Sequence, residues 1–492
     1  MRILVLLLGI LFGAFPTFGQ SEKDALPPVF SPRQLQEDFA LSRQFLETLH
    51  PALYDFVPKD KLNQMLDSVA GQLGREMTAL EFFRLLSPIV SGLGCGHTGV
   101  GLPTRESGFI KRFFPFGMAF LDSKAYIVDG TDTTPALLGA EVLSVNGKPM
   151  NALINELFRH ISTDGTGPSN RYMYLDNKFD IYYGLHVAQP DTFRLLIRTP
   201  AGSDSIIQVP AAFQRIKKQT RSRGRPASGP FPFSLDVRGH EVAVLTINMF
   251  YMEGKPQEYL DQKYRQFLDS CFIELKRQKT ENLIIDVRQN AGGYGTWGAW
   301  LFAYLARKPF RYYEEAVVTT NKDLPFIRYT DWKQEEYAEY VKDIVSKPSG
   351  GYRWTAHPNL NWQQPQPNSF AGPVYLLIGR RSFSTTAEFC AIAHSNKRAT
   401  FIGEETGGGY YSINGGDMME MILPNSKIKL AIPMRKYLLA VREGAPKGRG
   451  TLPDYPVTPT IQQFLKGEDV EMECTLKLIR KRSSIKRHKA PK

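Results

Sequence analysis

A hydroxyl-rich turn between two apolar strands is the feature that most restricts the fold of this sequence. The run Val374 to Ile378 is typical of a buried strand, and a second such run covers Thr400 to Ile402. Between them lie small and hydroxyl residues around Ser384 and an apolar-periodic segment from Ala387 to His394, which predicts a helix. A strand, a turn, a helix and a strand in this order indicate an α/β core with a hydroxyl at a helix N-terminus.

Two interpretations of Ser384 follow from this local pattern. Free N–H groups at a helix N-terminus can stabilise an oxyanion, so the hydroxyl can be an enzyme nucleophile. Ser and Thr are also preferred N-cap residues, and the local pattern alone favours a plain helix cap. Ser382, Thr385 and Thr386 carry hydroxyls in the same turn.

The stretch Gly379 to Gly409 resembles the nucleophile segment of the tail-specific proteases, also called C-terminal processing peptidases, with their tricorn-core and retinoid-binding relatives. In that family a Ser in a small-residue turn precedes an acidic residue, an Arg and a Gly-Glu-x-Thr-x-Gly strand end. The residues in those places are Ser384, Glu388, Arg398, Gly403, Glu404, Thr406 and Gly408. The resemblance implies that Ser384 is the nucleophile.

The general base is expected from a distant part of the chain. The branch with a Ser/Lys dyad carries its Lys where this chain has Gly409, and a Ser needs a base to act as a nucleophile. The tricorn-like branch takes its base from a Gly-His-Thr element, which Gly96, His97 and Thr98 match. The resemblance thus implies His97 as the base. A Cys95-x-His97 metal site is the alternative, without a second ligand pair nearby.

A second glycine-rich element, DVRQNAGGYGTW, follows another apolar run. It resembles the Asp-Leu-Arg-x-Asn-x-Gly-Gly element of the same family. The resemblance implies an oxyanion hole formed by N–H groups of Gly292, Gly293 and Thr385, where glycine leaves space for the substrate carbonyl. Asp286 and Arg288 are expected to hold the loop. The bland alternative is an ordinary strand-to-helix turn.

A carboxylate that assists the base is expected near the end of the protease region. GRGTLPDYPVTPT, Gly448 to Thr460, resembles the Gly-x-x-Pro-Asp element of the family. Tricorn-like enzymes carry a Glu shortly before it. Lys447 occupies the nearest equivalent position here and Glu443 is the closest acid, so Glu443 is the predicted helper of His97.

The N-terminal region has the pattern of a small helical bundle. Apolar residues recur at helical spacing between Pro32 and Leu86. Thr78 and Glu81 predict a capping box at the start of one helix. Pro88 predicts a break at the residue before it, because that residue disfavours helical backbone angles.

Residues 111–212 change to short strands with one helix. The segment Leu137 to Ile161 resembles a PDZ domain, with a strand, a tight turn at Asn146-Gly147 and a helix. Strands at Phe193 to Ile197 and Ile206 to Val209 would close the unit as a hairpin. A PDZ groove takes an extended peptide as an added strand.

The predicted fold class is α+β multidomain, which the length of 492 residues allows. Residues 311–366 are poorly patterned and are expected to form a lid or an accessory helix pair. The predicted parts are a signal peptide (1–20), an N-terminal helical domain ending in the Gly-His-Thr loop (21–110), a PDZ-like domain (111–212), a basic linker (213–232), a crotonase-like α/β serine protease core (233–465) and a basic C-terminal tail (466–492).

The net charge of +12 is concentrated in two segments. Six positive residues lie in 215–225 and eight in 477–492, with no acid in either, so the rest of the chain is close to neutral. Nucleic acid is therefore not the expected partner. Both segments are expected to be solvated and flexible, with weak contact to anionic surfaces at most. The four cysteines are too few and scattered for a disulfide framework.

The expected function is a serine peptidase that cleaves unfolded or tail-exposed polypeptides without a metal or organic cofactor. Arg2 and the apolar run from Ile3 to Phe15 predict export to the periplasm or the extracellular space, without stable membrane insertion. A non-catalytic protein that binds a hydrophobic ligand or a peptide on the same fold is the alternative. A peptidoglycan- or lipid-hydrolysing esterase with the same nucleophile is a further one.

Overall fold

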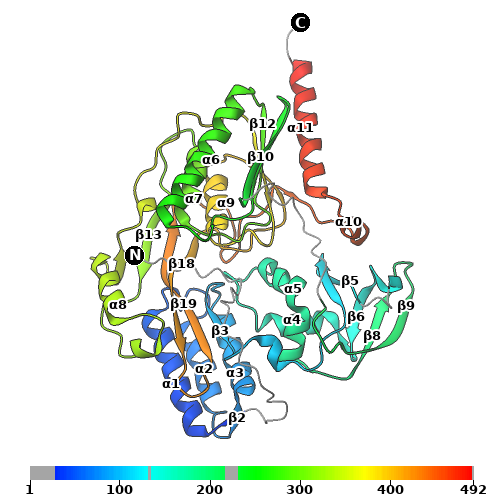
Figure 1. The fold of residues 1–492 in the computed structure, drawn as a ribbon, viewed down its shortest axis with the longest axis vertical. Coiled ribbons are helices and arrows are strands. Elements are labelled where there is room, and N and C mark those ends of the chain that lie inside the picture. Colours follow the sequence, from blue (N-terminus) through cyan, green and yellow to red (C-terminus); the bar gives the residue numbers. More distant parts are fainter. Residues whose placement is uncertain (1–27, 131–134, 217–230, 490–492) are drawn as a thin grey trace.

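The computed structural model describes residues 28–130, 135–216 and 231–489 (Figure 1). The predicted signal peptide and most of the predicted basic linker lie outside these ranges. The helices α1–α3 lie at one end of the molecule, the unit of residues 111–212 lies beside them, and the α/β core lies at the other end.

The α/β core is built on a six-stranded sheet. The edge strand β10 is antiparallel to its neighbour and the others are parallel, so five strands end at the same edge. Both strands predicted around the hydroxyl-rich turn are confirmed. The strand order is β10 (Phe233–Arg238), β11 (Val242–Ile247), β12 (Asn282–Asp286), β16 (Val374–Ile378), β17 (Thr400–Gly403) and β20 (Tyr455–Pro456).

Helices cover both faces of this sheet. The first face packs against α6 (Gln257–Arg277), α7 (Gly295–Ala303) and α9 (Thr385–Ser395). The other face packs against α11 (Val470–Lys489), which follows the short α10 (Ile461–Lys466). Because the parallel strands β12, β16 and β17 end at one edge, the loops after them converge there.

The segment 477–492 was expected to be flexible, but it is helical up to Lys489. It belongs to α11, in which Met472 and Ile479 are buried against the sheet, while Lys477, Arg480 and Lys481 are exposed. The basic composition concealed this because only one narrow side of the helix is apolar. Figure 1 shows the far end of α11 projecting beyond the body.

A second sheet connects the core to the N-terminal helices. Residues 311–366 contribute three of its strands and one seven-residue helix, α8 (Gln334–Tyr340), so the expectation of a lid or a helix pair is wrong. Figure 1 shows the long hairpin of β18 (Ser412–Ile422) and β19 (Lys429–Leu439) reaching from the core toward α1–α3. The strands are β14 (Ile344–Ser346), β15 (Tyr352–Trp354), β13 (Tyr313–Val318), β19 (Lys429–Leu439) and β18 (Ser412–Ile422), with β3 (Gly99–Gly101) paired to β19.

The N-terminal helices are α1 (Pro32–Leu49), α2 (Lys59–Ala70) and α3 (Ala79–Gly92), and the strands β1 (Val29–Phe30) and β2 (Met77–Thr78) pair beside them. The capping box of Thr78 and Glu81 is confirmed. The predicted break before Pro88 is wrong, since α3 continues through it. Ile89 and Val90 beyond the proline are buried, and their burial offsets the lost backbone hydrogen bond.

Residues 111–212 form an antiparallel sheet with two helices. The turn at Asn146 (φ 49°) and Gly147 (φ 82°) is confirmed, as is the predicted hairpin. The strands are β4 (Gly117–Leu121), β5 (Lys124–Asp129), β6 (Glu141–Val145), β7 (Lys148–Pro149), β8 (Thr192–Arg198) and β9 (Asp204–Pro210), and the helices are α4 (Met150–Phe158) and α5 (Ser169–His186).

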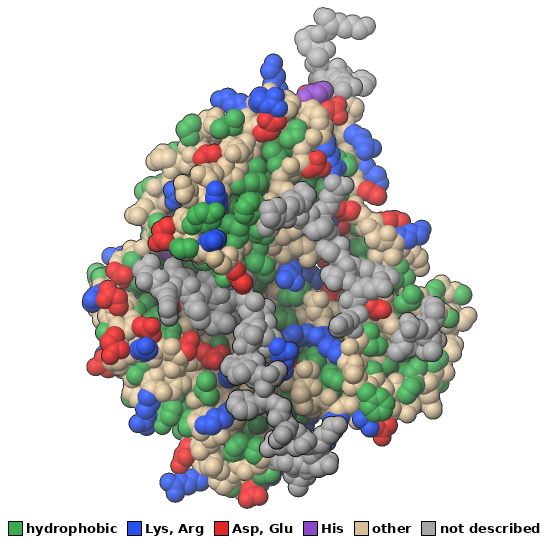
Figure 2. Space-filling model, in the orientation of Figure 1, with side chains coloured by type: hydrophobic (Ala, Val, Ile, Leu, Met, Phe, Trp, Pro, Cys, Tyr) green, Lys and Arg blue, Asp and Glu red, His purple; other side chains and the backbone are tan. Residues whose placement is uncertain are grey.

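The face in Figure 2 carries Lys and Arg side chains interspersed with Asp and Glu, with no large area of a single sign. This agrees with a body that is near neutral. Within the described ranges, no helix has the length and apolar character needed to cross a bilayer.

Candidate active site

Ser384 has a strained backbone at the edge where the parallel strands end. Its φ of 54° and ψ of −131° are rare for a residue with a side chain. It immediately precedes α9 but its hydroxyl makes no capping hydrogen bond, so the plain helix-cap interpretation is wrong. A strained turn that presents a hydroxyl at a helix N-terminus is the geometry of a nucleophile.

His97 meets Ser384 across 287 positions of the chain. The Nε2 of His97 lies 3.1 Å from the Oγ of Ser384, within hydrogen-bond reach. For Nε2 to accept the hydroxyl proton, the neutral imidazole carries its own proton on Nδ1. Burial lowers the pKa of His97 to about 4, which keeps the ring neutral and able to act as a base at ordinary pH.

Three contacts fix the position of the imidazole. The ring of Phe383 stacks on it with centroids 4.7 Å apart. The strand β3, directly after the His97 turn, pairs with β19. Thr98 hydrogen-bonds through Oγ1 to Nε2 of His50, at 2.8 Å. The Nδ1 of His50 accepts the N–H of Ala52, so its Nε2 is the donor to Thr98.

Asp164, in the unit of residues 111–212, joins two turns of the active site. Its carboxylate accepts hydrogen bonds from the N–H of Gly96 at 2.8 Å and, more weakly, from the N–H of Gly409 at 3.4 Å. Burial raises the pKa of Asp164 to about 7, although both N–H groups oppose that shift. The position where the dyad branch has its Lys is thus bonded to a carboxylate that also holds the turn of His97.

The loop after β12 packs directly on the nucleophile. A Cβ on Gly292 would lie 2.7 Å from the Cβ of Ser384, so only glycine fits there. The N–H of Gly292 already donates to the Oδ1 of Asn290 at 2.9 Å. Gly292 therefore serves as a packing position, and its predicted role as an oxyanion donor is not supported by this geometry.

Gly293 and Thr385 are the two remaining predicted donors. Within the described ranges, neither backbone N–H has a hydrogen-bond partner. The Oγ1 of Thr385 donates to the carbonyl of Gly293 at 2.8 Å, which fixes the two backbones relative to one another. Gly293 has a φ of 141° and a Cβ there would overlap the carbonyl of Phe250, so the loop tolerates no side chain.

The acid predicted to assist His97 lies in the wall of a neighbouring cavity. Glu443 is exposed in the loop after β19, and it lines a cavity of about 790 Å³ together with Asp164 and Gly409. The Nδ1 of His97 is buried, and among the described residues it has no hydrogen-bond partner. Among the described residues Nδ1 of His97 therefore has no acceptor, and no contact joins it to Glu443.

A second buried carboxyl lies behind the nucleophile helix. Glu388, one turn into α9, accepts a 2.8 Å hydrogen bond from the hydroxyl of Tyr313. Burial, and secondarily the charge of Asp164, raise the pKa of Glu388 to about 7, against the effect of Tyr313. This bond ties α9 to β13, so Glu388 contributes to the placement of the helix.

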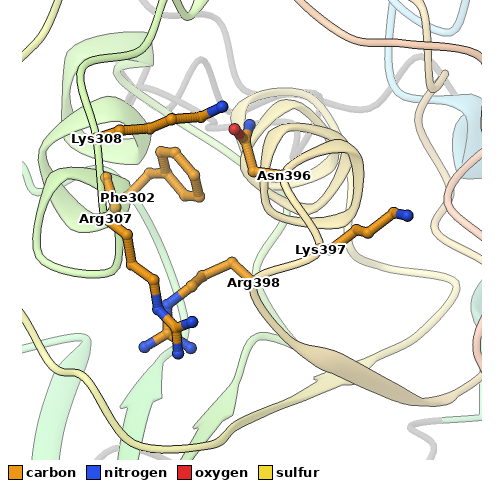
Figure 3. A pocket seen from close by; sticks show the side chains of 7 residues that line it. Phe302, Arg307, Lys308, Asn396, Lys397 and Arg398 are labelled. Atoms are coloured by element: carbon orange, nitrogen blue, oxygen red, sulfur yellow. The ribbon is translucent and has the colours of Figure 1, made fainter.

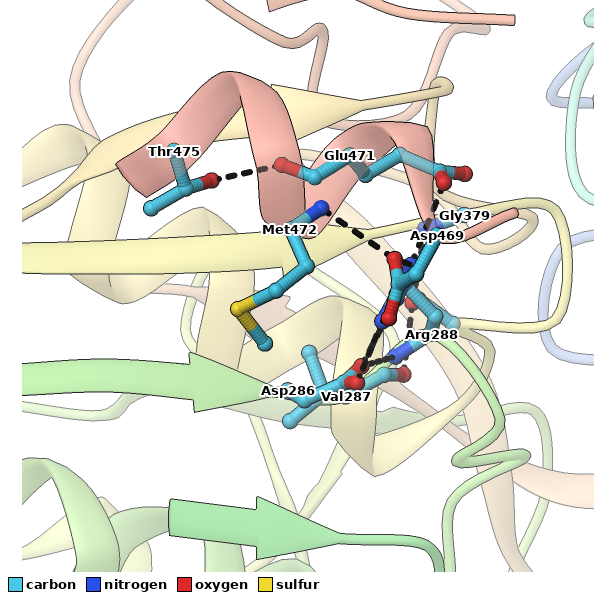
Figure 4. A network of polar contacts seen from close by, with 9 residues as sticks. Asp286, Val287, Arg288, Gly379, Asp469, Glu471, Met472 and Thr475 are labelled. Atoms are coloured by element: carbon cyan, nitrogen blue, oxygen red, sulfur yellow. Dashed lines mark hydrogen bonds and ion pairs between the residues drawn. The ribbon is translucent and has the colours of Figure 1, made fainter. Parts of the chain in front are cut away.

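The expectation that Asp286 and Arg288 hold the loop after β12 is confirmed. Arg288 is buried and binds Asp286, with 2.7 Å between Nη2 and Oδ2. Its Nη1 reaches Asp469 at 2.6 Å and Glu471 at 3.2 Å (Figure 4). The start of α11 is therefore bonded to the loop that carries Gly292 and Gly293.

The comparisons with known proteins agree with this geometry. Residues 241–457 match the model of peptidase family S41. The structure of mature CPAF is similar with a TM-score of 0.61 at 17% identity, covering 90% of this chain and 95% of that chain. Mature CPAF complexed with lactacystin gives a TM-score of 0.62 at 17% identity over 92% and 99%. No curated protein sequence matches the chain significantly.

The α/β core is a peptidase family S41 domain. The resemblance to the tail-specific and C-terminal processing proteases is thereby confirmed. The chain is a serine-type peptidase. The structures at 17% identity support the fold over nearly the whole chain.

Three residues of the site could not be assigned their roles from the sequence. Asp164 is a single acid in a segment that departs from a minimal PDZ pattern. Phe383 is an aromatic residue inside a hydroxyl-rich turn. The third, Asn290, stands in the Gly-Gly element that the sequence does reveal, but its bond to Gly292 depends on the folded loop.

Proposed function

We propose that this S41 peptidase cleaves unfolded or tail-exposed polypeptides with Ser384 as nucleophile and His97 as general base. The 3.1 Å approach of His97 Nε2 to Ser384 Oγ is the observation that carries the proposal. The Oγ attacks the scissile carbonyl while Nε2 takes the hydroxyl proton. His97 then donates that proton to the leaving amine, and water releases the acyl group by the reverse sequence.

The N–H groups of Gly293 and Thr385 would bind the oxyanion of the tetrahedral intermediate. Their fixed backbones need little reorganisation, and each such donor is worth roughly 100- to 1,000-fold in rate at comparable sites. Formation of an imidazolium places a proton on both ring nitrogens of His97. Glu443 is proposed to swing toward Nδ1 when substrate fills the cavity and to accept that hydrogen bond.

The direct test compares the chain from Ser21 with Ser384→Ala and His97→Ala, using fluorescein-labelled casein at about pH 8, where a His base is neutral. Cleavage by the unsubstituted chain alone, with fluorophosphonate labelling lost in both variants, is the expected result. Cleavage by Ser384→Ala would assign the nucleophile to another residue. Absence of both cleavage and labelling would favour the non-catalytic binding protein.

The unit of residues 111–212 is proposed to be PDZ-like and the core to be crotonase-like. The antiparallel sheet with α4 and α5 supports the first assignment, and the parallel strands with helices on both faces support the second. A peptide with a free C-terminus that raises the cleavage rate of casein would support peptide binding by this unit. No binding of such peptides would contradict it.

Export is proposed from the sequence of residues 1–20 alone. The positive residue, the short apolar run and the small residues before Gln20 are its support. Expression of the full chain and N-terminal sequencing of the product tests it. A product that begins near Ser21 in the periplasm or medium is expected, and an uncleaved cytoplasmic product would contradict it.

A further inference from the structure

Cationic side chains line a small cavity at the opposite edge of the parallel sheet from Ser384. Arg307 and Lys308 come from the segment after α7, and Lys397 and Arg398 from the turn that leads into β17 (Figure 3). The cavity has a volume of about 230 Å³. The rest of its lining is Phe302, Ala306 and Asn396, so no acidic residue faces it.

Backbone carbonyls hold both arginine side chains, and residues 370–372 supply three of them. Arg398 is buried and donates from Nε to the carbonyl of Leu305 at 2.6 Å, and from Nη2 to the carbonyls of residues 370 and 372. Arg307 donates from Nη2 to the carbonyl of residue 371 at 3.1 Å. Figure 3 shows the two guanidinium groups close together at one side of the cavity. Their positions are therefore fixed before any ligand arrives.

Among the described residues, no carboxylate pairs with this cluster of positive charge. In the described part of the chain, none of the four cations forms an ion pair with a carboxylate. Burial, and secondarily the charge of Arg307, lower the pKa of Arg398 to about 10. Elsewhere in the core a buried arginine is neutralised, as Arg288 is by Asp286. An anion between the two guanidinium groups would relieve their mutual repulsion.

We propose that this cavity binds an oxyanion of the phosphate class. Guanidinium groups offer paired N–H donors that match the oxygens of phosphate, and lysine ammonium groups add mobile point charges. A volume of about 230 Å³ accommodates one phosphate group with a few waters and is too small for a folded peptide segment. The site is separate from the peptidase site, so it stands whether or not Ser384 is the nucleophile.

A solvated basic patch is the plain alternative. Lys308 and Lys397 are exposed, and exposed lysines often have no ligand. The buried and anchored Arg398 distinguishes this cluster, because an immobile buried charge without a counter-ion is costly. The two lysines are not needed for the bonds that anchor either arginine, which makes them suitable positions for a test.

The test measures binding of inorganic phosphate to the full chain by isothermal titration calorimetry and by the shift in Tm, against chloride at matched ionic strength. The site variant is Lys308→Glu with Lys397→Glu. The control is Lys61→Glu with Lys322→Glu, two exposed lysines without an ion-pair partner in the described ranges that undergo the same change in charge. We expect at least tenfold weaker phosphate binding in the site variant and unchanged binding in the control.

Each outcome has a defined meaning. No phosphate response beyond that of chloride, or an equal loss in the site and control variants, would overturn the proposal. If phosphate binds and vesicles of phosphatidylglycerol also bind with the same dependence on both lysines, a lipid headgroup is a source of the anion. If phosphate binds and these vesicles do not, the ligand is a free phosphate compound.

Discussion

The two glycine-rich loops that flank Ser384 are held in different ways. The loop of Gly292 and Gly293 is fixed within the α/β core, by Asn290 and by backbone bonds to Phe250. The loop of Gly96 and His97 is fixed by contacts from two other parts of the chain, by Asp164 of the unit of residues 111–212 and by the pairing of β3 with β19.

Because the two loops are held differently, the proposed oxyanion donors and the proposed base depend on different parts of the fold. The proposed oxyanion donors depend on the fold of one domain, so their positions are set when the core folds. The position of His97, the proposed base, depends on contacts among the N-terminal helices, the unit of residues 111–212 and the core. Substitutions in the first loop should therefore affect the reaction through local steric conflict, and substitutions in the second through the position and protonation of His97.

The largest effect is expected for Gly292→Ala. The added Cβ would lie 2.7 Å from that of Ser384, and the φ of 108° strains any residue with a side chain. We expect the rate of fluorophosphonate labelling to fall about 1,000-fold or more, since both the nucleophile and the oxyanion donors are displaced.

Gly202→Ala is the matched control for this change. Gly202 has a φ of 91°, but no atom lies within 4 Å of a Cβ added there. An alanine at this position therefore has the backbone strain without the steric conflict. Its labelling rate should equal that of the unsubstituted chain. A similar loss of labelling in both variants, or retained labelling in Gly292→Ala, would contradict the packing argument.

Asp164→Asn should have the next largest effect. An amide supplies one acceptor oxygen in place of two and cannot hold both Gly96 and Gly409 in the same way. We expect kcat to fall about 10- to 100-fold, since the turn that carries His97 is displaced. Asp164→Ala should fall further, and Asp191→Asn, at an exposed ion pair, should not change kcat.

Equal losses in kcat for Asp164→Asn and Asp191→Asn would mean that Asp164 has no special role in positioning. A rise in KM without a change in kcat would place it in substrate binding instead. Far-ultraviolet circular dichroism and Tm of each variant show whether the fold is retained.

The sequence predicted the reacting groups better than their supports. Ser384 and His97 stand in motifs with local glycine and hydroxyl patterns, and their meeting in space agrees with the resemblance. Asp164 acts on residues 68 and 245 positions away, a relation that no local pattern records. The strands of residues 311–366 depend likewise on pairing with β19, and α11 depends on an apolar stripe that its basic residues hide.

The rate of fluorophosphonate labelling should depend on pH through Asp164, which holds the loop of His97 and not the loop of Gly292. The pKa of Asp164 is raised to about 7, so its carboxylate gains a proton as the pH falls through 7 and loses acceptor capacity toward Gly96 or Gly409. The pKa of His97 is lowered to about 4, so the base itself stays neutral in this range. We expect the labelling rate to fall about tenfold below pH 7, and expect Asp164→Asn to lack this step.

Other ionisable groups near Asp164 bear on this profile. Glu388, with a pKa also raised to about 7, and Cys95, with a pKa raised to about 12, both sense its charge. Glu388→Gln is therefore the control, and the step near pH 7 should persist in it. A step that disappears in Glu388→Gln and remains in Asp164→Asn would assign the titration to the carboxyl behind α9.

The smallest effect is expected for Glu443→Gln. Glu443 is exposed and must move to reach the Nδ1 of His97, so its contribution is limited by the share of molecules in which it does so. We expect kcat for casein to fall about tenfold, and expect fluorophosphonate labelling, which needs no proton transfer to a leaving amine, to fall less. Glu339→Gln, at an exposed ion pair remote from the cavity, is the control. If kcat is unchanged in Glu443→Gln, the imidazolium is stabilised without this carboxylate.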